Sequence, residues 1–176
     1  MNAAVNAFFL ILKLLSLYFL VVSLFSLCKR KMQKSSTTQR RFAVLIAARN
    51  EESCIAGLIE SLLAQNYPSE LFDIWVLPNN CTDHTADAAR HAGGKVLEMP
   101  TSIHSKGAAL QYAANTLLHG SRYYDAFCVF DADNEVDPAF LSEMNQALSR
   151  SAIVKSRILA KNRMQAGISA CYEIYF

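Results

Sequence analysis

Two aspartates stand one residue apart where an apolar segment gives way to polar residues. The segment reads FCVFDADNEVDP, and Asp131 and Asp133 follow its apolar part directly. A carboxylate at the edge of a core loses hydration energy unless a divalent cation, a Lys or Arg side chain, or bulk water meets it. Carboxylate oxygens suit Mg²⁺ or Mn²⁺, ions that proteins often hold together with substrate phosphates. A pair of structural aspartates, one capping and one solvated, is the alternative.

The elements that must position these aspartates alternate between short apolar runs and helical stripes of apolar residues. We expect strands at residues 42–48, 72–77, 95–99, 126–130 and 152–158. Between them, we expect helices that begin after an Asn50 cap, near Ala86, near Lys106, and at Asp137–Pro138. Glu51 and Glu52 would lie in the first turn of the first of these helices. This alternation predicts an α/β fold, a mostly parallel sheet with helices on both faces.

Three polar segments follow predicted strands directly and are therefore candidates for a binding site. They read ARNEE, PNNCTD and DADN. In open parallel sheets, ligands bind outside the carboxyl ends of the strands. Adjacent side chains in an extended strand point to opposite faces and those at i and i+2 to the same face, so the backbone bend at the strand end decides where Asp131 and Asp133 point. We expect the three segments to meet at one edge of the sheet.

The N-terminal segment is apolar enough to cross a membrane. Residues 7–28 contain one charged side chain, that of Lys13. As a helix they would be about 33 Å long, against about 30 Å for the hydrocarbon core of a bilayer. A signal peptide and a buried helix are the alternatives, but the segment starts without a basic residue and ends in CKRKMQK. We therefore predict a membrane anchor at residues 1–28, a basic polar linker at 29–41, and a domain at 42–176.

The charge distribution orients the predicted anchor. The basic residues that follow it are Lys29, Arg30, Lys31, Lys34, Arg40 and Arg41. The positive-inside rule then predicts a single-pass protein of the cell (inner) membrane whose domain faces the cytoplasm. Seven of the 17 Lys and Arg residues precede residue 42 and all 15 acidic residues follow it, so the domain carries a net charge of −5. An acidic domain argues against a general nucleic-acid-binding surface.

Five segments in order carry a resemblance to a known family. FAVLIAARNEE, the Tyr-Pro after the first helix, VLPNNCTDHTADAAR, SKGAALQYA and FDADN together resemble the family 2 glycosyltransferases, nucleotide-sugar enzymes of the GT-A (Rossmann-like) fold, many of which are membrane-attached and build polysaccharides. The resemblance covers about residues 42–165. VFDADNEV is also similar to the motif of haloacid-dehalogenase phosphatases, but that motif follows the first strand of its domain, whereas this one follows about the fourth.

The resemblance to glycosyltransferases implies a role for nine residues. Those it assigns to a UDP-sugar donor are Ala47, Ala48, Asn50, Glu51, Asn79, Asp83, Lys106 and Asp131. The ninth, Asp133, would coordinate the Mg²⁺ or Mn²⁺ that clamps the diphosphate. Within the set, Asn79 and Asp83 would hold the nucleotide, Lys106 would lie near the sugar and diphosphate, and Asp131 would contact ribose or sugar. The acceptor would be a saccharide or a lipid-linked molecule, with membrane lipid nearby.

The chain departs from the family pattern in two places. Asn79 stands where the family usually has an Asp, which changes charge and donor pattern at a base edge. In the family, an acidic motif well beyond the Asp-x-Asp segment supplies the base of inverting transfer, and the only acid beyond Glu143 is Glu173. We therefore expect a chain that lacks the catalytic base and binds donor with little transfer. A non-catalytic nucleotide-binding or membrane-assembly module is the alternative.

The remaining candidates have simpler explanations. We expect the four histidines on loops or the surface, and Trp75 in the core. A basic group near the C-terminus consists of Lys155, Arg157, Lys161 and Arg163. It would form a solvent-facing edge or contact an acceptor or lipid headgroups. The five cysteines are scattered without a Cys-x-x-Cys pair, which fits a reducing compartment and no zinc site.

Overall fold

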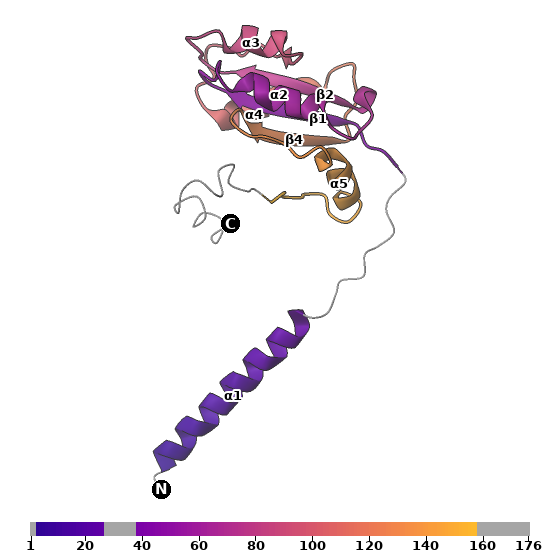
Figure 1. Ribbon diagram of the computed structural model, residues 1–176. Helices are drawn as coiled ribbons and strands as arrows, with labels where there is room; N and C mark the ends of the chain where they lie inside the picture. Colours follow the sequence, from indigo (N-terminus) through magenta and orange to yellow (C-terminus); the bar gives the residue numbers. More distant parts are fainter. Residues whose placement is uncertain (1–2, 27–37, 158–176) are drawn as a thin grey trace. The chain divides into compact units, whose positions relative to one another are not determined.

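The computed structural model describes residues 3–26 and 38–157. Its helices and strands are α1 (Ala3–Ser26), β1 (Phe42–Ala48), α2 (Ile55–Leu63), η1 (Ser69–Leu71), β2 (Phe72–Pro78), α3 (Thr85–His91), β3 (Lys95–Val96), α4 (Lys106–Leu118), β4 (Ala126–Asp131) and α5 (Phe140–Ala147) (Figure 1). Helix α1 and the sheet belong to separate compact units, and each is described by itself.

The sheet is parallel throughout its described strands, in the order β3-β2-β1-β4. Strand β1 is central and is buried along almost its whole length, as its continuous apolar sequence predicts. Its register aligns Ala47 with Leu77 of β2 and with Asp131 of β4. The carboxyl ends of these three strands therefore lie at one level, which confirms the predicted α/β fold.

Alternating residues of β1 pack against helices on the two faces of the sheet. Phe42, Val44 and Ile46 belong to a core with buried residues of α2, α3 and α5. Ala43 and Leu45 instead pack with Ala113 and Leu117 of α4. This division follows from the two-residue period of a strand, and it confirms that helices cover both faces.

Two predicted strands differ from the structure. The third is only Lys95–Val96, although the backbone N–H of Leu97 still donates to the carbonyl of Val76 at 2.9 Å. It is an edge strand with one neighbour, and Pro100 beyond it has no N–H to donate. The prediction of a fifth strand at residues 152–158 was wrong over its described part: residues 152–157 contain no strand, and Ile153 is 89% exposed. An apolar run forms a strand only where a partner strand accepts its hydrogen bonds.

Two predicted helix starts were also wrong. Asn50 does not cap α2: it has a left-handed φ of 58°, and α2 begins at Ile55 after Cys54, which makes no side-chain cap. Glu51 therefore lies in a loop before the helix. Helix α5 begins at Phe140 rather than at Pro138, because Asp137 closes a separate turn in which its Oδ1 accepts from Ala139 N at 2.8 Å. Side chains that accept from nearby backbone N–H groups form turns as readily as caps.

The start of α4 is confirmed. The helix begins at Lys106, and the Ser105 hydroxyl before it accepts a hydrogen bond from Ala108 N at 3.2 Å. This cap satisfies one of the backbone N–H groups that the first turn of a helix leaves without a partner. It also gives Lys106 a defined position at the helix N-terminus.

Helix α1 has the length and composition of a membrane span. Val5–Leu24 covers 20 residues with a mean hydropathy of 2.4, and none of its most apolar window is buried against protein. The predicted long apolar helix is thus confirmed. Residues 27 and 28 of the predicted anchor, and the basic residues from Lys29 to Lys34, lie outside the described residues.

Candidate functional site

Three loops meet at the carboxyl edge of the sheet. They follow β1, β2 and β4 and span residues 49–54, 79–84 and 132–139. The backbone N–H of Asn79 donates to the carbonyl of Ala48 at 3.0 Å, which extends the pairing of β1 and β2 past the strand ends. Because neighbouring strands lie about 4.8 Å apart, the residues that follow Ala47, Leu77 and Asp131 are close together. The predicted convergence of the three polar segments is thus observed.

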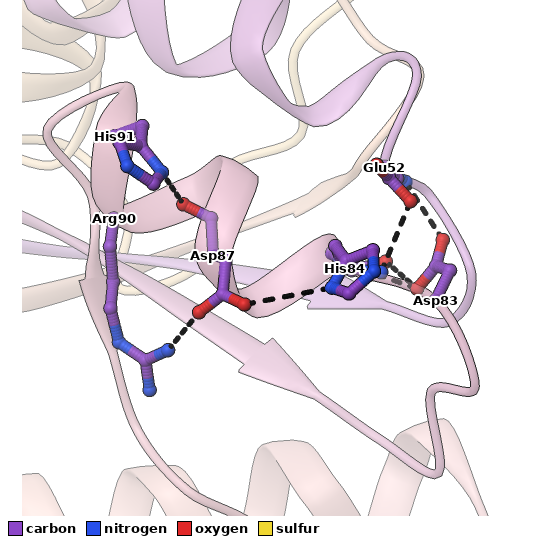
Figure 2. Close-up of polar contacts among 7 residues, drawn as sticks. Glu52, Asp83, His84, Asp87, Arg90 and His91 are labelled. Atoms are coloured by element: carbon purple, nitrogen blue, oxygen red, sulfur yellow. Dashed lines mark hydrogen bonds and ion pairs between the residues drawn. The ribbon is translucent and has the colours of Figure 1, made fainter.

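Asp83 ties the first two loops together. Its Oδ1 accepts from Thr85 N at 3.1 Å and from Thr85 Oγ1 at 2.5 Å, and its Oδ2 accepts from Glu52 N at 3.1 Å. Figure 2 shows Asp83 beside Glu52, at the start of α3. The hydrogen bond from Thr85 holds the pKa of the Asp83 carboxyl below its ordinary value. Both oxygens of this predicted nucleotide-binding residue therefore accept hydrogen bonds from the protein, which gives Asp83 a positioning role.

Thr85 is a site residue that the sequence analysis missed. It is fully buried, and its Oγ1 accepts from Glu51 N at 2.9 Å while donating to Asp83. Asn50 makes a parallel link, since its Oδ1 accepts from Thr82 N at 2.8 Å. The available signal was the Asp-x-Thr spacing, because Asp side chains commonly accept from the backbone two residues later.

Asn79 presents donors rather than acceptors. Asn80 Nδ2 donates to the carbonyl of Ile103 at 2.7 Å, which identifies this atom as nitrogen, and the same atom lies 2.9 Å from Asn79 Oδ1. Asn79 is 8% exposed, and the structure gives its Nδ2 no partner among the described residues. An Asp at this position would offer a charged acceptor instead.

Asp131 has a cationic partner. Its Oδ1 forms an ion pair with Lys106 Nζ at the start of α4. Asp131 is the last residue of β4, and a turn follows in which Asn134 N donates to Asp131 O at 3.2 Å. Asp131 and Phe127 are four residues apart in β4, so they belong to the same face of the sheet. Phe127 packs on the face that α4 covers. The lysine that the sequence places at the sugar and diphosphate thus meets the first aspartate directly.

Asp133 has different neighbours. It is exposed and borders a cavity of about 1080 Å³ that β4, α5 and residues 154–157 line. Apolar side chains such as Phe130 and Met144 line the cavity, together with the cations of Lys155 and Arg157 and the carboxylates of Asp133, Glu135, Asp137 and Glu143. Lys161 and Arg163, the other members of the predicted basic group, lie outside the described residues. Asp133 thus stands between the strand-end loops and a mixed apolar and charged cavity.

Cys54 lies close to the same carboxylate. Its Sγ donates to Glu51 Oε2 at 3.0 Å. Burial, this hydrogen bond and charge, and the charge of Asp133 raise the pKa of the Cys54 thiol to about 11. Cys54 is therefore a neutral thiol at physiological pH.

Among the described residues, all four histidines are exposed, as predicted.

The carboxylates of the site fit a divalent ion that also binds water and substrate oxygens. The described residues contain no group of three or more His, Cys, Asp or Glu side chains arranged to hold a metal. Asp133 alone, or together with Asp131, would supply hard oxygen ligands to an ion whose remaining positions are filled by water and substrate phosphates, the usual coordination of Mg²⁺.

Comparison with known proteins identifies the family. The sequence model of glycosyl transferase family 2 matches residues 43–171. The chain belongs to glycosyl transferase family 2. A beta-monoglucosyldiacylglycerol synthase of Synechocystis sp. is 26% identical in an alignment of 153 residues that covers 81% of this chain and 32% of that protein. A second synthase of this description, from Nostoc sp., is 40% identical over 43 residues, 24% of this chain and 9% of that protein. This family 2 chain spans about a third or less of the length of the curated relatives it matches.

Solved structures confirm the GT-A fold of this family 2 domain. The mannosyltransferase PcManGT of Pyrobaculum calidifontis, solved with GDP-Man and Mn²⁺, is 19% identical, with a TM-score of 0.62 over 78% of this chain and 40% of that one. TarS of S. aureus, residues 1–349, is 19% identical, with a TM-score of 0.53 over 72% of this chain and 40% of that one. The haloacid-dehalogenase alternative has no support from these comparisons.

Proposed function

We propose that this chain binds a UDP-sugar together with Mg²⁺ or Mn²⁺, and that the whole protein transfers the sugar with inversion. One observation carries the proposal: the carboxyl ends of β1, β2 and β4 gather the polar loops, Lys106 and both aspartates at one edge of a family 2 domain. Open parallel sheets bind their ligands at this edge. The acidic domain makes nucleic acid an unsuitable alternative ligand.

The nucleoside would lie along the first two loops. Ala47, Ala48, Asn50 and Glu51 would border the uracil and ribose, and Asn79 would donate from its Nδ2 to a carbonyl oxygen of the base. Asp83 and Thr85 stabilise the first loop, because they accept hydrogen bonds from the backbone of Glu52 and Glu51. Rigid backbone at a binding loop lowers the entropy lost when the ligand binds.

The diphosphate would lie between Asp133 and Lys106. Asp133 would hold the divalent ion, which when bound supplies positive charge to the departing diphosphate. Lys106 would add a second positive charge at the N-terminus of α4, where the helix dipole also favours anions. Asp131, which pairs with Lys106 in the structure, would contact ribose or sugar.

The acceptor would approach through the cavity beside Asp133. Its apolar lining fits a lipid part, and its mixture of carboxylates with Lys155 and Arg157 fits the hydroxyl groups of a saccharide or a polar headgroup. The glycolipid synthases among the relatives favour a lipid-linked acceptor over a free saccharide. Helix α1 would anchor the protein in the cell membrane, with the domain on the cytoplasmic side, next to such an acceptor.

Metal-dependent nucleotide binding tests the proposal. We expect the full chain in detergent micelles to bind UDP, measured by calorimetry, with Mn²⁺ and not without it. Asp133→Asn should weaken this binding at least tenfold, because the ion loses its charged ligand. Glu98→Gln is the matched control, since it removes one exposed carboxylate whose partner is Arg90 rather than a residue of the three loops. A folded protein that binds no UDP with either ion would refute the donor site.

A non-catalytic nucleotide-binding module is the second candidate. The observation that favours it is Asn79, which replaces the acidic side chain that the family usually has at this position. Such a module would bind UDP with metal as above but release no UDP from a UDP-sugar when acceptor is added to the whole protein. Sugar transfer by the whole protein would exclude it.

A further inference from the structure

We infer that Lys106 couples cation binding to nucleotide binding: it weakens the affinity of the site for a free divalent ion and strengthens it for the ion together with a diphosphate. The inference rests on the proposed function, because it concerns the same site. It differs from a simple phosphate contact in predicting opposite effects of one substitution on two measured affinities.

The ion pair of Lys106 is the first observation. Its Nζ contacts Asp131 Oδ1, and the two side chains are 50% and 60% exposed. The pair is open to solvent, so it contributes little to folding, about 0–1 kcal/mol. A contact of this strength can exchange partners when a stronger ligand for Lys106 arrives.

The spacing of the two aspartates is the second observation. Asp131 and Asp133 are two residues apart, so their Cα atoms are at most about 7 Å from each other. Lys106 pairs with the first carboxylate, and the second follows two residues later in the chain. With Lys106 paired to Asp131, a free cation meets the uncompensated charge of one carboxylate rather than two. Its affinity for the site is lower than the sequence Asp-x-Asp alone implies.

A bound diphosphate changes the partner of Lys106 and raises the affinity of the site for the ion. It brings oxygen ligands to the ion and anionic oxygens to Lys106, which then exchanges Asp131 for phosphate. The Ser105 cap holds Lys106 at the N-terminus of α4, so the ammonium and the positive end of the helix dipole act on the same anion. Released from Lys106, Asp131 becomes available to the hydroxyl groups of the sugar nucleotide. Nucleotide and cation therefore enter as a pair, and the empty enzyme holds little metal.

Two binding measurements on the full chain in detergent test the inference. Electron paramagnetic resonance of free Mn²⁺ gives the affinity for the ion alone, and calorimetry at saturating Mn²⁺ gives the affinity for UDP. We expect Lys106→Gln to bind Mn²⁺ alone about threefold to tenfold more tightly than the wild type, the effect of one unit charge a few ångströms away in a solvated site. The same variant should bind UDP with Mn²⁺ about tenfold more weakly.

Two further variants serve as controls. Lys106→Arg keeps the charge and should stay within about twofold of the wild type for Mn²⁺ alone. Arg90→Gln removes a unit positive charge from another exposed ion pair, on α3, and should change neither affinity. Arg90→Gln has the same net charge change as Lys106→Gln, so nonspecific effects of net charge are excluded.

The outcomes separate the inference from the function it rests on. Opposite changes in the two affinities support the inference. An unchanged or weaker Mn²⁺ affinity in Lys106→Gln overturns the inference, and the proposed function stands if the wild type still needs Mn²⁺ to bind UDP. A wild type that binds UDP under no condition overturns both.

Discussion

Thr85 joins two loops of the site through a single hydroxyl. The hydroxyl accepts from the backbone of Glu51 and donates to Asp83, and no part of the residue is exposed to solvent. Asp83 in turn accepts from Glu52 N. The backbone of the loop after β1 is therefore held at Glu51 by a residue 34 positions later in the sequence. These two side chains fix the backbone of the proposed binding loop.

Substitution of this hydroxyl gives a prediction for one residue. Thr85→Val keeps the shape but leaves Glu51 N without its acceptor, so we expect a loss of about 1–3 kcal/mol in the free energy of unfolding. UDP affinity with Mn²⁺ should fall at least threefold because the loop is no longer held. Thr85→Ser keeps the hydroxyl and should retain UDP affinity. Urea unfolding and calorimetry measure the two effects; equal UDP affinity in Val and wild type would contradict the positioning role.

A second polar cluster stabilises the opposite end of the sheet. Asp73, near the start of β2, is 6% exposed and accepts from Lys95 Nζ and Tyr124 OH, each at 2.7 Å, while Arg122 Nε lies 2.9 Å from its Oδ2. Trp75 Nε1 donates to the same tyrosine hydroxyl at 3.2 Å, and Trp75, predicted to lie in the core, is half-buried and packs against the core on the α4 face. The cluster joins β2, β3 and the connection from α4 to β4, elements that the site depends on.

The Asp73 cluster predicts a pH dependence of stability. Burial opposes ionisation of this carboxyl, but hydrogen bonds from Lys95 and Tyr124 outweigh it, so its pKa lies below the ordinary value. A depressed folded pKa stabilises the fold above the unfolded value, near pH 4, and this contribution is lost as the pH falls through the folded pKa. We expect Asp73→Asn to cost about 1–3 kcal/mol at pH 7.

Urea unfolding from pH 7 to pH 3 measures this effect. The difference between Asp73→Asn and the wild type should shrink as the pH falls below about 4, because the carboxyl of the unfolded chain binds a proton there before that of the folded protein does. Asp87→Asn, which removes an exposed ion pair, should cost less than about 1 kcal/mol at every pH. A constant difference between Asp73→Asn and wild type across the range would show that ionisation of Asp73 is not the cause.

The whole molecule combines an apolar helix with an acidic domain. Val5–Leu24 is long enough to cross a bilayer, and the residues that follow it are basic, whereas the domain carries a net charge of −5 from 15 acidic and 10 basic residues. Basic residues next to a span tend to remain in the cytoplasm, whereas acidic residues contribute little to orientation. The proposed site would then face the cytoplasm.

Protease accessibility tests this orientation. With a tag at the C-terminus, we expect digestion of the tag in inverted membrane vesicles and protection in intact spheroplasts. Changing Lys29, Arg30, Lys31 and Lys34 to Gln together should raise the fraction of molecules in the opposite orientation, because the charge bias is reduced. Arg90→Gln, in the domain, should leave the orientation unchanged. Digestion in spheroplasts of the wild type would refute a cytoplasmic domain.

The sequence by itself determined the alternation of strands and helices, the apolar N-terminal helix, and the polar segments at the strand ends. These features arise from local periodicity: β1 is a continuous apolar run, and α4 begins where Ser105 can cap it. Five motifs in the correct order were also enough to indicate glycosyl transferase family 2, which the match over residues 43–171 confirmed.

Only the tertiary structure decided which polar side chains meet. Asn50 was predicted to cap a helix, but the approach of the loop after β2 lets it bond Thr82 instead. Residues 152–157 are apolar enough for a strand, but no described strand pairs with them. Asp131 pairs with Lys106, 25 residues earlier, because parallel crossovers bring the start of α4 to the end of β4. Contacts of this kind depend on packing between distant segments, which no local pattern encodes.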